Sequence, residues 1–584
     1  MFRKRIASVL TLAAAVAILA TASAQAATRT FNFFGSGFGH GVGMSQWGAY
    51  GLALDGWSHK QILRHYYSGT TVAANPSAPS TIRVGLVDGV QAVHLTAVNG
   101  PVPLTTGSPA PGGKFVAAIP SGATFLVKGG SGNFVIRDGS GAKVAPSVDG
   151  SKKLYVGYRA SGAMARSAEA GHTYNRGVVQ LENYRPCTTC GHAERMIAVV
   201  TPQEYLYGLG EVPSSWPMQA LEAQADAART YAERLISAAG QHRVGCDCAV
   251  YDDTRDQVYA GFDHEGESGG SRWVSAVDRT NGEVILYEGS LIQAFYSSSS
   301  GGFTESNQNV WGGSPVPYLH GVCDPGDFTA ANPARQWKAS FSATLITSRL
   351  RPSTGDIGRV RTFRHIHRGV SGRLMSLTVV GGRGKRAITG AAFRSALGLM
   401  DDRVWINTDK NVTGAIRGLY DSLECAPGLP TSPKVAIPGG SRQSFVRGAI
   451  YRNRHGDRTV WLFGNIYTKY VELKEASSVL GLPVSRIAKL TKPAGCAKQL
   501  CRKARFDDGV ILSKPDTGAH ELDGPMLTYY LSQGGVLGHL GFPMSDVVSM
   551  TGGGTQSTFQ GGPGGSPIIV ACDSSGTCSE STPS

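Results

Sequence analysis

The chain has 584 residues, of which 41% are hydrophobic, and a formal net charge of +14 at pH 7. This length exceeds what one hydrophobic core usually serves, so we expect two or three domains. The positive charge favours contact with anionic polymers through long-range attraction. A nucleic-acid-binding chain would need a basic stripe with stacking aromatic residues or a known binding motif, and we do not expect nucleic acid as a partner.

Residues 1–26 have the pattern of a secretory signal. Arg3, Lys4 and Arg5 precede an apolar run, and Ala24-Gln25-Ala26 offers a small-residue cleavage site. We therefore expect a secreted protein, extracellular or associated with the cell wall, whose charge falls to +11 once the three basic residues of the signal are removed from +14. No other stretch has the roughly 18 consecutive apolar residues of a membrane helix, so we expect no membrane span after cleavage. An uncleaved signal would act as a membrane tether.

The elements predicted along the chain are mixed. Residues 82–156 form short alternating runs interrupted by Gly, Pro and Asn, which predicts strands with tight turns. A long Ala-rich helix follows, then strands at 282–287 and 373–380 and a short helix near 389–399. The sequence therefore predicts an α+β fold in which one long helix accompanies a β-rich region.

Glu211 lies on a loop just ahead of the Ala-rich helix. Pro217 fits a first helical turn, where its missing N–H costs little, and Ser215 is a suitable N-cap. We therefore expect the helix to start near Trp216 and to end at Gly240. The sequence thus places one carboxylate at the entrance of a helix.

Residues 210–232 contain a Glu-hydrophobe-Pro, a Trp-Pro and an Ala-Gln-Ala-x-Ala-Ala-Arg-Thr-Tyr-Ala segment. This stretch resembles the core motif of the stage II sporulation protein D / amidase-enhancer (SpoIID/LytB) family. Asp226 departs from that pattern, because the family usually has an apolar residue there, so we expect an unusual polar contact or an exposed position. Further segments that resemble the family are at 39–49, 201–206, 296–304 and 310–312, and together the matches cover most of residues 31–400.

The order of these segments differs from that of better-known family members, in which the Gly-His-Gly-x-Gly-Met-Ser-Gln segment comes near the end. Here it occupies residues 39–46, far ahead of the Gly-x-x-Phe-Arg element at 390–399 that it usually follows. A circular permutation explains this order if residues 31–34 pack beside a strand at 404–407. The alternative is a misplaced or nonfunctional copy. We prefer the permutation, because residues 66–70 also resemble the family.

The domain organisation follows from these patterns. We predict a SpoIID-like domain at 27–424, a Pro-, Gly- and Ser-rich linker at 425–444, a repeat domain at 445–570 and a tail at 571–584, disordered from Ser574 on. The repeat domain resembles the Leu-Gly-Phe-Pro (LGFP) module of actinobacterial wall proteins, in which such units anchor or position the enzyme. The recurring motifs that carry this resemblance are Leu480-Gly481-Leu482-Pro483 and Leu540-Gly541-Phe542-Pro543.

The family resemblance implies that Glu211 acts on peptidoglycan as the single acid and base of a lytic transglycosylase. Ordinary glycoside hydrolases use two carboxylates, whereas this reaction needs one, which protonates the leaving oxygen and then takes the proton of the sugar's own 6-hydroxyl. Apolar neighbours such as Val212, Pro213 and Trp216 would raise the pKa of the acid, and the helix N-terminus would oppose them. Alternatively, Glu211 caps the helix or pairs with Arg229.

The family name also implies a second function, that of a noncatalytic wall-binding protein that enhances a partner amidase. A purely structural surface protein is a third. The expected partners are peptidoglycan glycan strands, anionic wall polymers and, for the second function, a wall amidase. The sequence is equally compatible with a role in wall remodelling during growth and with a role in sporulation.

Several polar residues of the resembling segments are candidates for binding substrate. The Gly-rich segment lets a polymer approach the backbone closely, although a plain Gly-rich turn against the core is the alternative. It lacks the Gly-Lys-Ser/Thr of a phosphate loop, and residues 297–302 lack the Gly-x-Ser-x-Gly of serine hydrolases. The candidate substrate-binding residues are His40, Ser45, Gln46, Gln224, Arg229, Tyr231, Tyr296, Ser298, Ser299 and Thr304.

Ten cysteines in an exported chain indicate disulfides. The pairs expected from the sequence are Cys496 with Cys501, Cys572 with Cys578, and Cys323 with Cys425. The other four permit disulfides or, with a nearby histidine, a tetrahedral zinc site, and the resemblance implies structural zinc in some relatives. We expect disulfides and no cofactor. The residues of the zinc alternative are Cys187, Cys190, His192, His242, Cys246 and Cys248.

Overall fold

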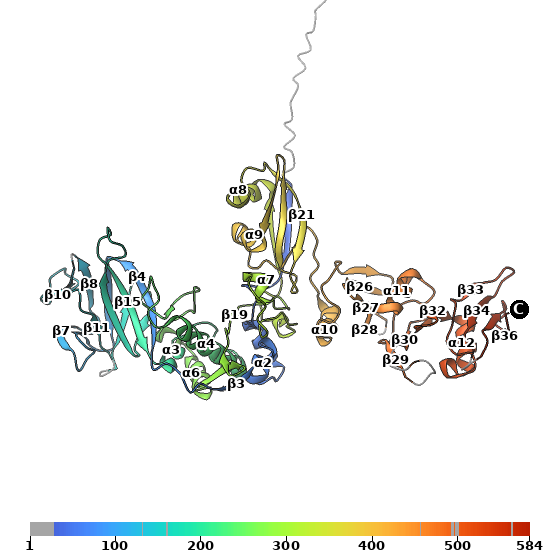
Figure 1. Ribbon diagram of the computed structural model, residues 1–584, viewed down its shortest axis with the longest axis horizontal. Helices are drawn as coiled ribbons and strands as arrows, with labels where there is room; N and C mark the ends of the chain where they lie inside the picture. Colours follow the sequence, from blue (N-terminus) through green and yellow to red (C-terminus); the bar gives the residue numbers. More distant parts are fainter. Residues whose placement is uncertain are drawn as a thin grey trace, which may run out of the picture.

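The computed structural model describes residues 29–583, except 131, 159–161, 456, 492–495, 497–500 and 562–564, so the predicted signal at 1–26 lies outside the described residues. Figure 1 shows a β-rich lobe, a helical region around α4 (Met218–Ala239), a small sheet covered by α8 (Ala343–Thr354) and α9 (Gly390–Leu397), and a row of C-terminal units. Among the described residues, no helix has the length and apolar character that crossing a membrane requires. The α+β prediction is confirmed.

The N-terminal strand β1 (Thr30–Gly35) lies between β20 (Trp337–Ser342) and β24 (Val404–Ile406) and is antiparallel to both. Phe33 pairs with Ile406. The predicted adjacency of residues 31–34 and 404–407 is therefore confirmed. In Figure 1, β1 is the blue strand among the yellow ones.

Phe33 is fully buried in a core that the neighbouring helices and sheet complete. Two aromatic neighbours, Phe341 and Phe393, lie with their ring centroids 5.7 and 5.9 Å from that of Phe33. The N-terminal strand thus supplies a central part of this core. The surrounding elements are β21 (Val360–Arg368), β22 (Leu374–Gly381), β23 (Lys385–Thr389), α8 (Ala343–Thr354) and α9 (Gly390–Leu397).

The β-rich lobe is a sandwich, and it confirms the strands predicted at 82–156. In its described part, one sheet has the order β16-β4-β15-β14-β11-β6-β7 and the other β10-β9-β8-β5-β12-β13. Buried side chains of both sheets, such as Leu95, Val127, Leu154 and Met196, share one core. The strands are β4 (Ile82–Val90), β5 (Ala92–Val98), β6 (Val102–Thr106), β7 (Lys114–Ile119), β8 (Thr124–Gly130), β9 (Asn133–Arg137), β10 (Val148–Asp149), β11 (Leu154–Val156), β12 (Met164–Ser167), β13 (Thr173–Tyr174), β14 (Val178–Tyr184), β15 (Ala193–Val200) and β16 (Val250–Tyr251).

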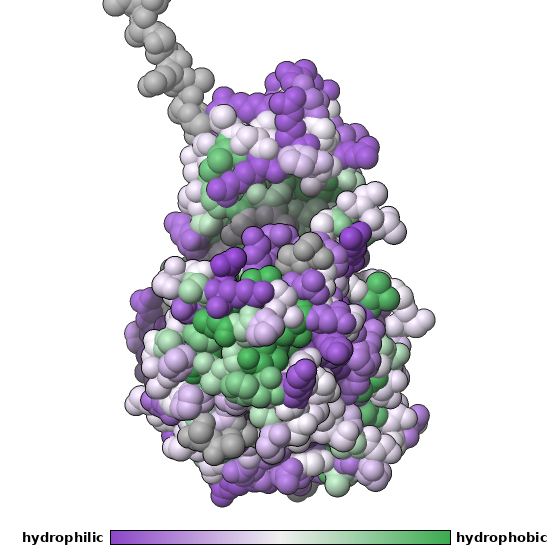
Figure 2. All heavy atoms as spheres, turned by 90° about the vertical axis from the view of Figure 1, so that its left-hand side faces the viewer, coloured by the Kyte–Doolittle hydropathy of each residue, from purple (hydrophilic) through white to green (hydrophobic). Residues whose placement is uncertain are grey.

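Hydrophobic side chains gather on the outward side of this lobe, as Figure 2 shows. The lobe also has a hollow of about 710 Å³, lined by residues that include Pro103, Ala118 and Val156. Among the described residues, no charged side chain lines this hollow.

The long helix α4 (Met218–Ala239) begins two residues later than predicted. Pro217 is its N-cap and no side chain caps it, so the prediction of Ser215 as the cap is wrong. The reason is a turn ahead of the helix, in which the Trp216 N–H donates to the Pro213 carbonyl. Gly240 ends the helix as predicted, with a φ of 76° that favours glycine.

Helix α4 is buried on most sides, and its alanines permit close packing of neighbouring elements. At Asp226, where the sequence departs from the family pattern, we expected a polar contact or an exposed position. The structure has the polar contact, because this fully buried carboxylate pairs with Arg229. The elements around α4 are α1 (Gln46–Leu54), α2 (His59–Tyr66), α3 (Pro202–Tyr207), α6 (Gly270–Arg279), β3 (Thr71–Ala74), β17 (Glu283–Tyr287) and β18 (Ser290–Leu291).

Three units with the same contacts follow one another in the described C-terminal part, where the sequence predicts an internal repeat. Each unit has a helix whose buried tyrosine donates its hydroxyl proton to a glycine carbonyl, followed by a proline bridged to a phenylalanine. The tyrosine–glycine pairs are Tyr420–Gly428, Tyr470–Gly481 and Tyr530–Gly541, at 3.1, 2.6 and 2.7 Å, and the bridges are Pro430–Phe445, Pro483–Phe506 and Pro543–Phe559.

The first unit begins at α10, inside the range predicted for the preceding domain. The predicted linker at 425–444 carries β25 and most of β26, and the predicted tail carries β36, paired with β35. Both differences arise because these strands are short and lie between turns that contain Pro or Gly. The elements are α10 (Gly414–Ser422), α11 (Gly464–Glu472), α12 (Gly524–Ser532), β25 (Val435–Ile437), β26 (Gly440–Phe445), β27 (Gly448–Asn453), β28 (Arg458–Leu462), β29 (Ala488–Leu490), β30 (Cys501–Arg505), β31 (Gly509–Lys514), β32 (Gly518–Asp523), β33 (Val548–Ser549), β34 (Thr555–Phe559), β35 (Ile568–Cys572) and β36 (Cys578–Ser581).

The three disulfides predicted from the sequence are confirmed. Cys323 pairs with Cys425 and links the first C-terminal unit to the segment ahead of β20, across 102 positions of sequence. The other two close short loops, and they are Cys496–Cys501 and Cys572–Cys578.

Replacing Phe33 by Ala tests the contribution of the N-terminal strand. We expect a loss of about 3–5 kcal/mol from the part of the chain built on β1, because a fully buried phenylalanine leaves a cavity. Calorimetric melting would show that transition at a lower temperature. Phe115→Ala is the control, since Phe115 is 63% exposed. Equal effects of the two substitutions would contradict a central role for β1.

Candidate functional site

Glu211 lies on a loop that its surroundings hold in place. Its neighbour Gly210 donates its N–H to the Val258 carbonyl at 3.0 Å. On the other side of the loop, the Trp216 ring packs against Trp47 and Tyr50, with centroid distances of 4.7 and 5.1 Å. Helix α1 therefore packs against the loop that carries Glu211 and holds it in position.

Three donors contact the half-buried carboxyl of Glu211. The Val258 N–H donates to Oε1 at 2.7 Å, and the Gln46 amide donates to Oε2 at 3.3 Å. The Tyr296 hydroxyl is the third. No ion pair to Glu211 occurs within the described ranges, and Arg229 pairs with Asp226 instead. Neither the predicted alternative of a helix cap nor that of a pair with Arg229 is present.

Burial raises the pKa of Glu211 above its ordinary value. The hydrogen bonds from Val258, Gln46 and Tyr296 oppose this, because they stabilise the carboxylate, but burial outweighs them. Val212 and Trp216 are buried beside the loop, as the sequence suggested, whereas Pro213 is exposed. The carboxyl group is thus suited to holding a proton for transfer to a ligand.

An open groove of about 450 Å³ runs past this carboxyl. Two aromatic side chains at its wall, Phe38 and Trp311, are 47% and 50% exposed. Such rings beside polar groups suit a sugar chain, which has apolar faces and hydroxyl edges. The predicted residues that line the groove with Glu211 are His40, Gln46, Tyr231, Tyr296 and Ser298.

The groove forms because two distant segments pair in parallel. Strand β2 (Met44–Ser45) lies beside β19 (Tyr296–Ser297), and the Trp47 N–H then donates to the Ser298 carbonyl at 3.0 Å. Gly43 has a φ of 72°, and a Cβ there would lie 2.0 Å from the Phe295 carbonyl oxygen. Glycine is therefore required at this position for the close approach.

The remaining predicted binding residues lie in the interior. Ser45 caps α1 and donates to Asp327 Oδ1 at 2.6 Å, and Ser299 donates to Asp327 Oδ2 at 2.8 Å. Burial raises the pKa of Asp327 to about 7. These side chains connect the segments beneath the groove rather than facing a ligand. The predicted residues in this group are Ser45, Gln224, Arg229, Ser299 and Thr304, all buried.

His40 stands at the groove as a neutral side chain. Burial and the Arg373 guanidinium lower its pKa to about 4. Its Nδ1 accepts the Val42 N–H at 3.0 Å, which leaves the proton on Nε2. The ring also packs against Trp311, with centroids 5.1 Å apart. His40 thus orients the aromatic wall of the groove.

Sequence reasoning missed several groups that shape the site. Val258 acts through its backbone N–H, which nearly every residue type has, so its side chain gives no indication of this role. Asp256 accepts a hydrogen bond from the Tyr231 hydroxyl at 3.1 Å and forms an ion pair with Arg243. Phe38 directly precedes the Gly-rich segment. An aromatic residue next to such a segment is the sequence feature that could have identified Phe38 as a groove residue.

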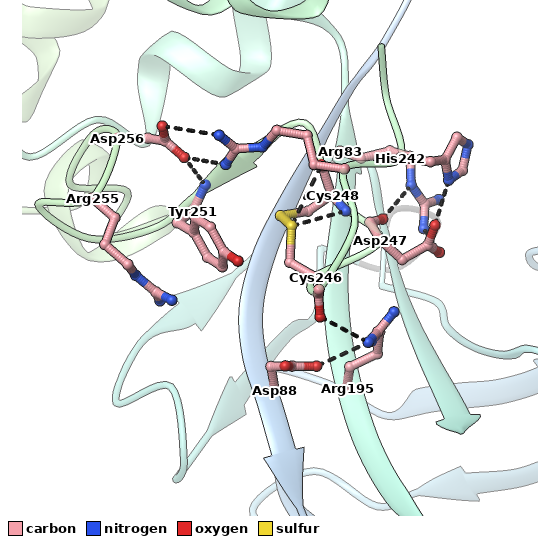
Figure 3. The surroundings of a disulfide bond; sticks show 12 residues. Arg83, Asp88, Arg195, His242, Cys246, Asp247, Cys248, Tyr251, Arg255 and Asp256 are labelled. Carbon is pink, nitrogen blue, oxygen red and sulfur yellow. Dashed lines mark hydrogen bonds and ion pairs between the residues drawn. A yellow bond between two sulfur atoms is a disulfide. The ribbon is translucent and has the colours of Figure 1, made fainter. Parts of the chain in front are cut away.

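The four cysteines of the zinc alternative form two disulfides, Cys187–Cys190 and Cys246–Cys248. Disulfide sulfurs provide no thiolate, so these residues as arranged do not fit a zinc ion. His242 pairs with Asp247 at 2.6 Å and His192 with Asn183. Figure 3 shows the Cys246–Cys248 disulfide near the start of the loop that leads to Asp256.

Parts of the chain are similar to known proteins. The chain is 44% identical over 117 residues to the amidase enhancer of Bacillus subtilis (strain 168), covering 20% of this chain and 14% of that protein. It is 31% identical over 180 residues to the stage II sporulation protein D of Bacillus amyloliquefaciens, covering 29% of this chain and 50% of the relative. The chain therefore spans half or less of the length of these two relatives.

A third relative, stage II sporulation protein D of Bacillus subtilis (strain 168), is 26% identical over 239 residues, which cover 39% of this chain and 66% of that protein. Glu211 and α4 lie inside the range that matches a family model. Residues 191–287 of the chain match the family described as SpoIID, stage II sporulation protein.

Proposed function

We propose that the chain is an exported protein that acts on peptidoglycan, a lytic transglycosylase that cleaves glycan strands and leaves anhydro-muramyl ends. The observation that carries this proposal is one carboxyl of raised pKa, Glu211, that faces an open groove. The similarity of residues 191–287 to the SpoIID family supports it.

The reaction needs one group that first gives and then takes a proton. Protonated Glu211 donates its proton to the glycosidic oxygen as the bond to the sugar breaks. The resulting carboxylate, stabilised by the Val258 and Gln46 donors, removes the proton of the sugar's 6-hydroxyl, and that oxygen bonds to the anomeric carbon. No water is added, and Glu211 regains its proton.

A second carboxylate for ordinary hydrolysis is not free in the groove. Asp256 is the one other carboxylate among the described lining residues. It is held by Arg243, by the Tyr231 hydroxyl and by the Tyr251 N–H at 2.8 Å. Since a hydrolase uses a second carboxylate as nucleophile or base, this arrangement favours the reaction with a single acid.

The second candidate function is a noncatalytic wall-binding protein that enhances an amidase. Similarity to a protein named amidase enhancer favours it. In this function the same groove binds glycan strands without cleaving them. In either function, we propose that the C-terminal units are LGFP-like repeats that hold the protein on the wall, and that the N-terminal position of residues 39–46 reflects a circular permutation.

The substitution Glu211→Gln separates the two functions. With the purified chain and peptide-stripped glycan strands, mass spectrometry should find anhydro-muramyl ends for the wild type and none for Glu211→Gln, because the amide cannot donate the proton. Glu267→Gln is the control, since Glu267 is 41% exposed and pairs with His264 outside the groove. Persistence of the ends in Glu211→Gln would refute its role, and their absence from the wild type with retained binding would favour the enhancer.

Trp311→Ala should weaken binding to glycan strands. An exposed aromatic side chain at a groove contributes about 1–3 kcal/mol to binding when it is covered by ligand, which corresponds to roughly a 5- to 150-fold weaker affinity. Pull-down with insoluble peptidoglycan measures the change. Phe115→Ala is the matched control, because Phe115 is an exposed aromatic residue of the β-rich lobe, outside the groove and outside the C-terminal units. An unchanged affinity would show that the ligand does not lie on this wall.

The pH dependence of cleavage should report the pKa of Glu211. Activity should fall as pH rises through that pKa, because only the protonated form can donate, and the midpoint should lie above the ordinary value of 4.5. Gln46→Ala should move the midpoint to still higher pH, since the lost amide N–H stabilises the carboxylate. Gln203→Ala, whose side chain bonds Val277 and Asp278, is the control. A midpoint unmoved by Gln46→Ala would contradict the assignment.

A further inference from the structure

Three potential metal ligands meet on the helical side of the molecule, away from the groove. His59 is at the start of α2, Asp226 is in the middle of α4 and Glu283 begins β17. One ligand atom from each lies within 4.8 Å of the other two. The N-terminal segment, the long helix and the strand beside it thus contribute one group each to the cluster.

The distances fit a small cation between these atoms. His59 Nε2 lies 3.1 Å from Glu283 Oε2 and 3.8 Å from Asp226 Oδ2. In a tetrahedral zinc site with bonds of about 2.0–2.1 Å, neighbouring ligand atoms are about 3.3–3.4 Å apart. The two measured distances lie on either side of this spacing, so small side-chain adjustments suffice.

Each carboxylate presents one oxygen to the cluster because a cationic side chain holds the other. Lys60 Nζ lies 2.7 Å from Glu283 Oε1, and Arg229 Nη1 lies 3.2 Å from Asp226 Oδ1. Asp226 is fully buried, and its Oδ2 has no hydrogen-bond partner among the described residues. A buried oxygen without a partner is costly, and this one faces His59.

The histidine is oriented for coordination. His59 Nδ1 lies 3.1 Å from Glu222 Oε2 and 3.3 Å from Gln219 Oε1, and both are acceptors. They favour a proton on Nδ1. Nε2 itself donates to Glu283 Oε2 at 3.1 Å, and it would release this proton to coordinate an ion placed between Asp226 and Glu283. A carboxylate behind the ligating histidine is the usual second layer of a zinc site.

We propose that His59 Nε2, Asp226 Oδ2 and Glu283 Oε2 form a binding site for Zn²⁺, with water as the fourth ligand. One imidazole and two carboxylates suit zinc, whereas calcium and magnesium prefer oxygen ligands alone. The ion would join α2 to α4 and β17, and its charge would offset the two carboxylates. The site is separate from Glu211 and does not depend on the proposed reaction.

The test uses the full chain after treatment with a chelator. Addition of ZnCl₂, followed by gel filtration and metal analysis, should give one retained zinc per chain and a higher melting temperature. His59→Gln and Glu283→Gln should each weaken binding at least tenfold and remove the thermal shift. His94→Gln is the matched control and should bind zinc like the wild type, because His94 pairs with Glu169 at 2.6 Å and, among the described residues, no third potential ligand joins this pair.

Two results would overturn the site. One is a wild type that retains no zinc and melts at the same temperature with and without it, which would mean that a protonated His59 joins the carboxylates as a plain ion-pair network. The other is equal zinc binding by the wild type, His59→Gln and Glu283→Gln. Glu283 is partly exposed and at a strand end, so its variant gives a result even where a substitution of buried Asp226 prevents folding.

Discussion

The parallel pairing of β2 with β19 is the contact on which the groove depends. It joins residues about 250 positions apart in the chain and continues into the hydrogen bond between Trp47 and Ser298. Without it, Gln46 would not reach the Glu211 carboxyl, and the aromatic contact of Trp47 with Trp216 would be lost. The absent side chain of Gly43 permits this approach, and the buried Ser45–Asp327 bond secures it.

The surroundings of each buried or half-buried carboxyl group determine whether it can exchange a proton with a ligand. Glu211 is half-buried, has only neutral donors around it and faces an opening, so it can exchange a proton with a ligand. Asp226 is fully buried beside Arg229, with one oxygen unsatisfied. Asp327 is enclosed by serine hydroxyls. Neutral donors stabilise the Glu211 carboxylate without removing its proton permanently, which an adjacent guanidinium would do.

Much of the chain architecture could be predicted from sequence, because it depends on patterns of residue type. The three disulfides follow from the spacing of the cysteines, and the adjacency of β1 and β24 follows from the order of the segments that resemble the family. The orientation of polar side chains could not be predicted. Ser45 and Ser299 belong to segments that resemble a known family, but the resemblance indicates which segments meet, not which hydroxyl faces the groove. Val258 contributes a backbone N–H, which any residue except proline supplies.

The N-terminal segment has a part in both sites, and this connects them. Helix α1 supplies Gln46 to the groove, and α2, which follows it directly, supplies His59 to the three-ligand cluster. Both helices pack on α4, whose first turn follows the Glu211 loop. The N-terminal segment crosses the fold to reach α4, and contacts at both of its ends hold it there. At one end of that segment, β1 pairs with β20 and β24, and β2 pairs with β19. At the other end, the polar cluster at His59 holds the segment in place. The position of Gln46 beside the carboxyl is therefore set from both sides.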